Sequence, residues 1–170
     1  LPISTEHDQH IDYRAEAKRI GADRFYTPVI GCEVTTYEGH FNTFPIHSGA
    51  KPAVHKQLPW PEVFKNIYST PGVRVAILNH ARDVHRGYKP FDPAQFDAEA
   101  GVFTDGRVLK ANGLELINSG AQQSDPMQLV HDWMALLRSG HKIAGVGSSD
   151  SHTVNFAIVG QARTYISCDD

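Results

Sequence analysis

The sequence has few cysteines, no long apolar run and no excess of positive charge, and each absence excludes a class of protein. Its two cysteines, Cys32 and Cys168, form no CxxC pair and no disulfide framework. One bridge between them is open to the chain, but two free thiols in a reducing compartment are the simpler interpretation, so we expect a cytoplasmic protein. No apolar run approaches the roughly 18 residues of a membrane span. A net charge of −3 at pH 7 disfavours a general nucleic-acid binder.

Motifs of several common catalytic classes are also missing. The chain has no phosphate-binding Walker loop and no dinucleotide fingerprint, since Gly145-Val146-Gly147 alone is a weak match. Serines at positions 148, 149 and 151 lie close to His152, but no Gly-x-Ser-x-Gly elbow holds any of them. The sequence therefore does not support a nucleotide-binding protein or a serine hydrolase.

What the chain has in excess is histidine, at ten of its 170 residues. Histidine is the commonest metal ligand and the commonest proton carrier near neutral pH. Because an excess alone fits scattered surface residues equally well, the positions of the histidines must decide. Loop positions without a role are expected for four of them: His55, His85, His131 and His141.

Short apolar runs alternate with helix-like stretches along the chain. Helices are predicted over residues 13–20, 61–68, 93–100 and 126–138, from capping residues, prolines and glycines at their ends. Strand-like runs occupy residues 3–5, 29–36, 41–46, 73–78, 114–118, 143–147 and 162–166. This alternation predicts an α/β fold built on a parallel sheet or a barrel. Because both ends of the sequence are strand-like, we expect it to be part of a larger fold.

Ionisable residues lie at the ends of four of these predicted strands. His7 follows the first strand, Glu33 lies near the end of the second, and His80 follows the strand over residues 73–78. Asp150 and His152 come after the strand over residues 143–147. Because the carboxyl ends of parallel strands gather on one face, where barrel enzymes build their sites, we expect these side chains to converge.

The spacings within this set favour a metal site. Asp150 and His152 are two residues apart, so on an extended backbone both point the same way. Glu33 and His40 flank a predicted turn between two β segments, so they can also meet. The donors are nitrogen and oxygen only, which suits Zn, Mn or Fe and disfavours a structural zinc site. The alternative for Asp150 and His152 is a capping aspartate beside a surface histidine.

Five short motifs follow one another in a fixed order. They are Thr5-Glu6-His7-Asp8, Gly31-Cys32-Glu33-Val34-Thr35-Thr36, Gly39-His40-Phe41-Asn42, Asn79-His80-Ala81-Arg82 and Gly147-Ser148-Ser149-Asp150-Ser151-His152. This set resembles the PHP (polymerase and histidinol phosphatase) superfamily. The Glu-His-Asp form and the Gly-His-Phe-Asn-x-Phe-Pro run are most similar to its CehA/McbA-type metallohydrolases. The resemblance extends over nearly the whole chain, so we expect residues 1–170 to form a single domain.

The resemblance implies a distorted (β/α)7 barrel that holds two or three divalent metal ions. The implied metal ligands are His7, Glu33, His40, His80, Asp150 and His152, with Glu33 as the bridging carboxylate. Arg82 is implied as a contact for a substrate anion, and Glu6 and Asn42 as residues that support the ligands. The family opens with a His-x-His strand that does not occur in residues 1–170, so we expect the barrel to be incomplete here.

The function implied by the resemblance is that of a metal-dependent hydrolase, most often a phosphoesterase. Metal-activated water attacks the substrate, and Asp150 or His152 relays the proton. Cleavage of a carbamate or carboxylic ester is the alternative within the same family, and a non-catalytic interaction module is the rival from another class. An exonuclease attached to a DNA polymerase is disfavoured by the acidic charge balance. The expected partner is a small phosphoester or ester, with no nucleic acid and no membrane.

Overall fold

The computed structural model describes residues 3–83, 89–120, 125–153, 155 and 158–167. Its centre is a five-stranded mixed sheet in the order β3-β4-β5-β8-β9. Strand β4 runs antiparallel to both β3 and β5, whereas β5, β8 and β9 run parallel to one another. The bounds of these strands are β3 (Cys32–Thr36), β4 (Gly39–Phe44), β5 (Val75–Asn79), β8 (Gly113–Asn118) and β9 (Ala144–Ser148).

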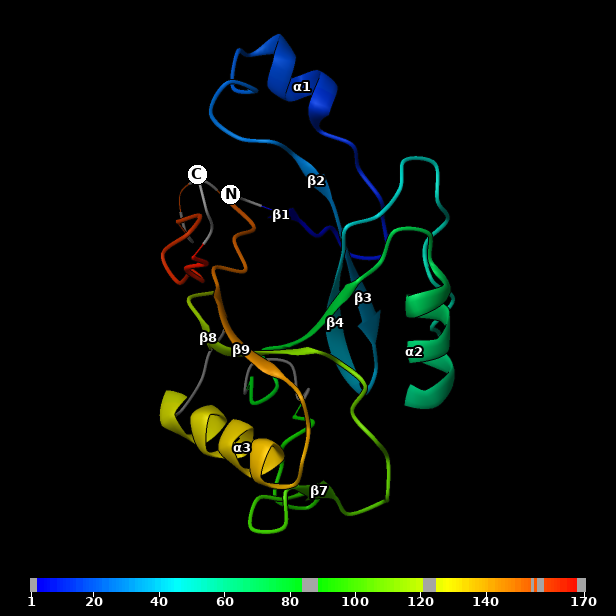
Figure 1. Cartoon of the computed structure of the whole chain (residues 1–170), viewed down its shortest axis with the longest axis vertical. Coiled ribbons are helices and arrows are strands. Elements are labelled where there is room, and N and C mark those ends of the chain that lie inside the picture. Colours follow the sequence, from blue (N-terminus) through cyan, green and yellow to red (C-terminus); the bar gives the residue numbers. More distant parts are fainter. Residues whose placement is uncertain (1–2, 84–88, 121–124, 154, 156–157, 168–170) are drawn as a thin grey trace.

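Smaller elements flank this sheet. Strand β1 (Ile3–Ser4) pairs in parallel with β2 (Val29–Ile30), and β6 (Phe96–Asp97) pairs antiparallel with β7 (Val102–Phe103). The described helices are α1 (Arg14–Arg19), α2 (Trp60–Ser69) and α3 (Pro126–Arg138). Figure 1 shows the strands following an open arc, with α2 and α3 on its outer side.

The apolar core lies between the sheet and these two helices. One register row across four strands carries Val34, Phe41, Leu78 and Leu114, all of them buried. The Phe41 ring meets the rings of Trp60 and Phe64 on α2 edge to face, with centroids 5.7 Å and 4.9 Å apart. Burying one such large side chain contributes about 1.5–3 kcal/mol to folding, so this row is a major source of stability.

The neighbouring register row is polar and faces the other way. It places Thr35 opposite His40 and His40 opposite Asn79. Because successive side chains of a strand point to opposite faces, this row lies on the face of the sheet that α2 does not cover. The sheet therefore separates an apolar outer face from a polar inner face.

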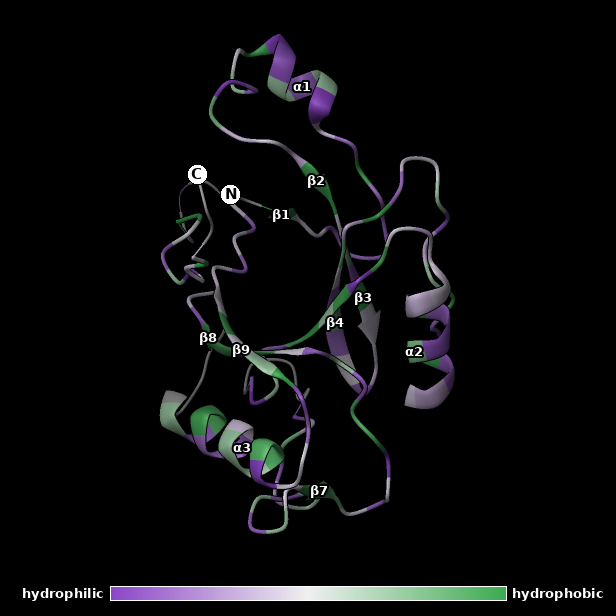
Figure 2. Cartoon of the chain, viewed as in Figure 1, coloured by the Kyte–Doolittle hydropathy of each residue, from purple (hydrophilic) through white to green (hydrophobic). Residues whose placement is uncertain are grey.

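The helices form where the sequence caps them and gives them one apolar side. In α2, Pro61 occupies the first turn, where its missing N–H costs nothing, and Val63, Phe64 and Ile67 are buried on one side. In α3, the Asp125 side chain accepts a hydrogen bond from the Met127 N–H at 2.9 Å. Helix α1 is largely hydrophilic (Figure 2) and contributes only Ala17 to the buried residues.

The prediction of a distorted (β/α)7 barrel is wrong. A barrel of that kind needs parallel strands separated by crossover helices. Residues 37–38 join β3 to β4 directly, and so short a connection makes the two strands an antiparallel hairpin. Only three helices occur among the described residues, and parallel pairing within the five-stranded sheet is limited to β5, β8 and β9. The structure is a mixed sheet with small accessory pairs.

Three local predictions also need correction. The strand expected over residues 29–36 is split at Gly31, where an added Cβ would lie 2.7 Å from the Ser4 carbonyl oxygen because β1 passes so close. The helix expected over residues 93–100 is replaced by the β6–β7 hairpin, since the Asp92 and Asp97 side chains accept hydrogen bonds from nearby backbone N–H groups. The strand expected over residues 162–166 does not form.

Residues 162–166 instead run beside β9 without ladder pairing. The Thr164 hydroxyl accepts from the Gly147 N–H at 3.0 Å and donates to the Gly147 carbonyl at 3.1 Å. A single side chain thus satisfies backbone groups that a neighbouring strand would otherwise pair.

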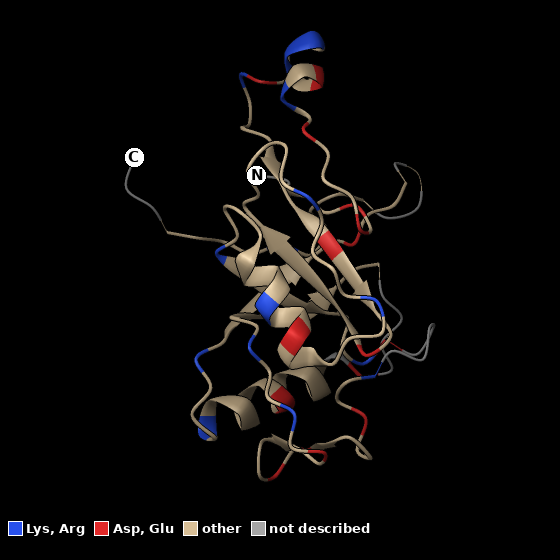
Figure 3. Cartoon of the chain, turned by 90° about the vertical axis from the view of Figure 1, so that its right-hand side faces the viewer, with Lys and Arg blue, Asp and Glu red and all other residues tan. Residues whose placement is uncertain are grey.

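Charged side chains are interspersed over the helices and loops (Figure 3). Several are paired close by, as with Arg14 and Asp12, Arg19 and Glu16, and Arg107 with Asp105. No helix in the described part of the chain is long and apolar enough to cross a bilayer. Two residues singled out from the sequence, His85 and Cys168, lie outside the described residues.

Candidate metal centre

Three donor side chains meet beside the first half of β3. One atom each of His7, Glu33 and His40 lies within 4.8 Å of the other two. His40 Nδ1 is 2.9 Å from Glu33 Oε1, and His7 Nδ1 is 3.5 Å from Glu33 Oε2. Glu33 and His40 are buried, whereas His7 is exposed. A His-His-Glu group of this kind can hold a metal ion.

Backbone pairing explains why these three donors meet. The β3–β4 hairpin places Glu33 opposite Asn42, so His40 lies on the same face, one diagonal step away. The segment around His7 pairs with Glu33 as an isolated parallel bridge. In it the Glu33 N–H donates to the Glu6 carbonyl, and the Asp8 N–H donates to the Glu33 carbonyl, both at 3.0 Å. The prediction that Glu33 and His40 converge across a turn is confirmed.

His80 extends this group on the side of His40. It comes directly after β5, and its Nε2 is 3.3 Å from Glu33 Oε1. The His80 and His40 rings stand edge to face with centroids 4.9 Å apart. The Nδ1 atom of His80 is buried and has no hydrogen-bond partner among the described residues. A buried nitrogen without a partner is rare in native structures and points to a missing ligand such as an ion or a water.

Asp150 and His152 lie at the margin of the group, with His152 beside His7 and Asp150 linked to Asn118. The His152 and His7 rings are 5.9 Å apart between centroids, and His152 Nδ1 donates to the Asp150 carbonyl at 2.9 Å. Asp150 has a φ of 47°, so the backbone here is not extended and the alternation argument from the sequence does not apply. The structure brings both residues near the cluster but not into the His7–Glu33–His40 group.

The electrostatics of the group are dominated by burial and by ion pairing. Burial opposes the negative charge on Glu33, but the hydrogen bonds from His40 and His80 outweigh it and lower the pKa of Glu33 well below its usual range. Burial likewise opposes charge on His80, yet its hydrogen bond to Glu33 and the nearby carboxylates raise its pKa to about 9. The Glu33 carboxylate is therefore ionised and surrounded by imidazoles.

Backbone strain concentrates at the same place. Four described residues other than glycine have a positive φ, and three of them are Asp8 at 56°, His80 at 27° and Asp150 at 47°. Such conformations cost about 1–3 kcal/mol each and persist only where surrounding contacts hold them. They gather at functional sites because the required side-chain direction outweighs the backbone cost.

Arg82 is held by an acidic partner on α3. Its Nε and Nη2 atoms donate to the two carboxylate oxygens of Asp132 at 2.5 Å and 3.0 Å, and Nη1 lies 3.4 Å from Gln128 Oε1. Asp132 is only 1% exposed. The structure thus gives Arg82 a structural role, and its contact with a substrate anion stays a prediction.

The motifs contain two further residues whose contacts with the candidate ligands were not predicted. Asn79 Nδ2 donates to Glu33 Oε1 at 3.3 Å, and Thr35 Oγ1 is 2.6 Å from His7 Nδ1. Both residues belong to the polar register row. The alternation of side chains along β3 and β5 could therefore have indicated that they face the candidate ligands. Of the two residues implied as supporting the ligands, Glu6 accepts a hydrogen bond from the Tyr13 hydroxyl at 2.5 Å, and Asn42 lies opposite Glu33.

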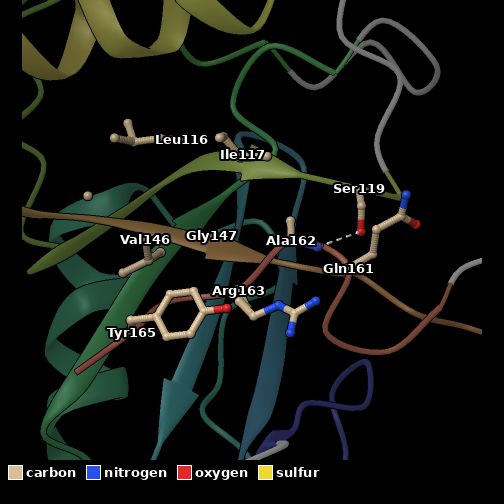
Figure 4. Close-up of a pocket in the computed structure, with 10 residues that line it drawn as sticks. Leu116, Ile117, Ser119, Val146, Gly147, Gln161, Ala162, Arg163 and Tyr165 are labelled. Carbon is tan, nitrogen blue, oxygen red and sulfur yellow. Dashed lines mark hydrogen bonds between the residues drawn. The ribbon is translucent and has the colours of Figure 1, made fainter. Parts of the chain in front are cut away.

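A separate hollow of about 680 Å³ lies between β8, β9 and the segment that follows residue 160. Figure 4 shows the Arg163 and Tyr165 side chains beside it and the hydrogen bond from the Ala162 N–H to Ser119 Oγ. None of the predicted metal ligands lines this hollow, and neither does Arg82. Its walls are mainly apolar side chains and glycine backbone, so it adds no donor atom to the metal centre.

Comparison of the chain with models of known families, with curated proteins and with solved structures finds no match. The assignment of a function therefore depends on the residues themselves.

Proposed function

We propose that this chain is a metal-dependent hydrolase related to the PHP superfamily, and that its substrate is a phosphoester. The observation that carries the proposal is the buried Glu33 carboxylate with imidazoles on both of its oxygens. Oε1 faces His40 and His80, and Oε2 faces His7. A carboxylate placed in this way can bridge two ions, one on each side.

The donor set fits a catalytic divalent ion. It consists of imidazole nitrogens and carboxylate oxygens without a thiolate, which favours Zn, Mn or Fe over a structural zinc site. The buried Nδ1 of His80, which has no hydrogen-bond partner among the described residues, further supports a ligand at this group. In this proposal Glu33 is shared by two ions, with His40 and His80 on the side of Oε1 and His7 on the side of Oε2, while Asp150 and His152 lie beside them.

The chemistry of hydrolysis divides between the ions and the chain. Divalent ions held by these donors supply the Lewis acidity that activates water and polarises the scissile bond. Asp150 and His152 lie at the accessible margin, and the His152 side chain is 61% exposed, so they are placed to carry a proton between the site and solvent. The substrate is a small phosphoester, approached from the side of the exposed His7 and His152.

Metal reconstitution of the protein tests the proposal. The protein is loaded with Zn, Mn or Fe, its metal content is measured by elemental analysis, and hydrolysis of p-nitrophenyl phosphate and of an aryl carbamate is followed. The Glu33→Gln variant should lose bound metal and turnover. The matched control Glu62→Gln, on the exposed side of α2, should retain both.

Each outcome of this experiment decides one part of the proposal. A folded protein that binds none of the three metals refutes the metal centre. Bound metal without turnover of either substrate refutes the hydrolase. Turnover of the carbamate alone replaces the phosphoester by an ester as the substrate class.

A further inference from the structure

A chain of hydrogen bonds joins His80 to Asp150 through Glu115 and Asn118. Its central residue is Glu115, which lies on β8 and is 1% exposed. Glu115 Oε2 accepts from the His80 N–H at 2.5 Å and from Asn118 Nδ2 at 2.8 Å. Glu115 Oε1 accepts from the Ser148 hydroxyl. A carboxylate with both oxygens occupied by protein donors is fixed in position and is not directed at solvent.

Asn118 carries the chain on to Asp150. Its Nδ2 group donates to Glu115 Oε2 and also to Asp150 Oδ2, the latter at 3.2 Å, while its Oδ1 accepts from the Gly120 N–H at 2.8 Å. The primary amide has two hydrogens on Nδ2, so it can donate to two carboxylates at once. Asn118 is therefore a neutral bridge between two acidic side chains that would otherwise repel each other.

The two residues at the ends of the chain are those that need support. His80 and Asp150 both hold a left-handed backbone conformation without being glycine. The β8–β9 pairing shifts register between Glu115 and Ile117, so the ladder itself is irregular at this point. Without Glu115, the His80 N–H would be left in a buried position without an acceptor, which is unfavourable for a backbone donor.

We infer that Glu115 is a positioning residue of the metal centre. It fixes His80 directly through the backbone N–H and fixes Asp150 through Asn118. It thereby holds the two strained loops after β5 and β9, which carry His80 against Glu33 and Asp150 beside His152. The inference rests on the proposed metal centre and adds a residue that touches neither ion nor substrate. Residues that orient ligands in this way typically change metal affinity by about 10–100-fold when removed.

The geometry distinguishes the effect of the hydrogen bonds from that of the charge. In Glu115→Gln, the amide oxygen can take the place of Oε2 and keep its bonds from His80 and Asn118. The amide nitrogen then takes the place of Oε1 and donates to the Ser148 hydroxyl, which can accept as well as donate. Glu115→Ala removes all of these bonds. A positioning role therefore predicts that glutamine rescues what alanine loses.

The test is a Co²⁺ titration of the full chain, followed by the visible absorption bands that report the ligands around the ion, with thermal unfolding measured on the metal-free protein. Glu115→Ala should weaken Co²⁺ binding about tenfold or more and change the band shape, whereas Glu115→Gln should stay within about threefold of the parent. Asn118→Ala should weaken binding less, because it leaves the His80 bond in place. The double variant should bind no more weakly than Glu115→Ala alone, since both changes break the same chain.

The outcomes of this test distinguish a failure of the positioning role from a failure of the proposed metal centre. If Glu115→Ala folds and matches the Glu62→Gln control in affinity and spectrum, the positioning role is refuted while the metal centre stands. If Glu115→Ala does not fold, Asn118→Ala decides: an unchanged spectrum overturns the link to Asp150, and a changed one supports it. If the parent protein binds no Co²⁺, the metal centre itself is refuted and the inference fails with it.

Discussion

Replacing Arg82 by methionine tests whether a buried ion pair ties α3 to the loop after β5. The Arg82 guanidinium donates two hydrogen bonds to the carboxylate of Asp132, a residue that is 1% exposed. Methionine has a similar length and fills the same space, but it leaves that carboxylate without its partner. Removing one partner of a buried pair costs about 3–5 kcal/mol. The Arg82 side chain is 18% exposed, so water can reach the site in part, and we expect a loss of about 3 kcal/mol, at the lower end of that range.

Urea denaturation of the metal-free protein measures this loss. With a slope of about 2 kcal/mol per molar urea, a loss of about 3 kcal/mol lowers the midpoint by about 1.5 M. The double variant Arg82→Met with Asp132→Leu should recover much of the lost stability, because no charge is then left buried. The control Arg19→Met removes an exposed ion pair with Glu16 and should leave the midpoint nearly unchanged. A midpoint for Arg82→Met equal to that of the control would refute the reasoning.

Three further predictions concern the core, a helix cap and a thiol. Phe41→Ala should lower the free energy of unfolding by about 3–5 kcal/mol in urea, because it leaves a cavity against α2; a loss below about 1 kcal/mol would contradict the described packing. Asp125→Ala should lower the free energy of unfolding by about 1 kcal/mol, because α3 loses its N-terminal cap, and the melting temperature should drop slightly. An unchanged melting temperature would show that the cap does not stabilise the protein. Burial raises the pKa of the Cys32 thiol to about 12, so in a Cys168→Ser background a thiol reagent at pH 8 should react only after unfolding. Rapid reaction of the native protein would show that Cys32 is accessible.

The sequence predicted the elements of the fold better than their arrangement. Most of the expected helices and strands occur within a few residues of their predicted bounds, because apolar spacing and capping residues act locally. The direction of β4 follows from the two residues between Thr36 and Gly39, which form a hairpin turn. The short spacing indicates this turn, but the alternation of strands and helices along the chain favours parallel strands instead. The expectation of parallel strands failed at this connection, and the barrel failed with it.

The candidate site shows the same division between local and long-range information. Glu33 and His40 were paired correctly because they share one hairpin, whose geometry follows from short spacing. The role of Glu115 could not be predicted, because its partners His80 and Ser148 lie 35 and 33 residues away along the chain. A lone acidic residue within an apolar strand was the only sequence signal for it. Arg82 follows His80 in its motif, whereas its partner in the structure lies on a helix 50 residues away along the chain.

The spread of the donors along the chain sets an order in which the centre can assemble. Glu33 and His40 are 7 residues apart, so closing one hairpin brings them together at little entropic cost. His80 must join from 47 residues away, and the contact between Arg82 and Asp132 spans a further 50. Contacts at such separations form late, because the loops they close must first lose their conformational freedom. On this order, folding first brings together Glu33 and His40 and adds the other donors later, and local opening at α3 should release His80 while the hairpin pair is still intact.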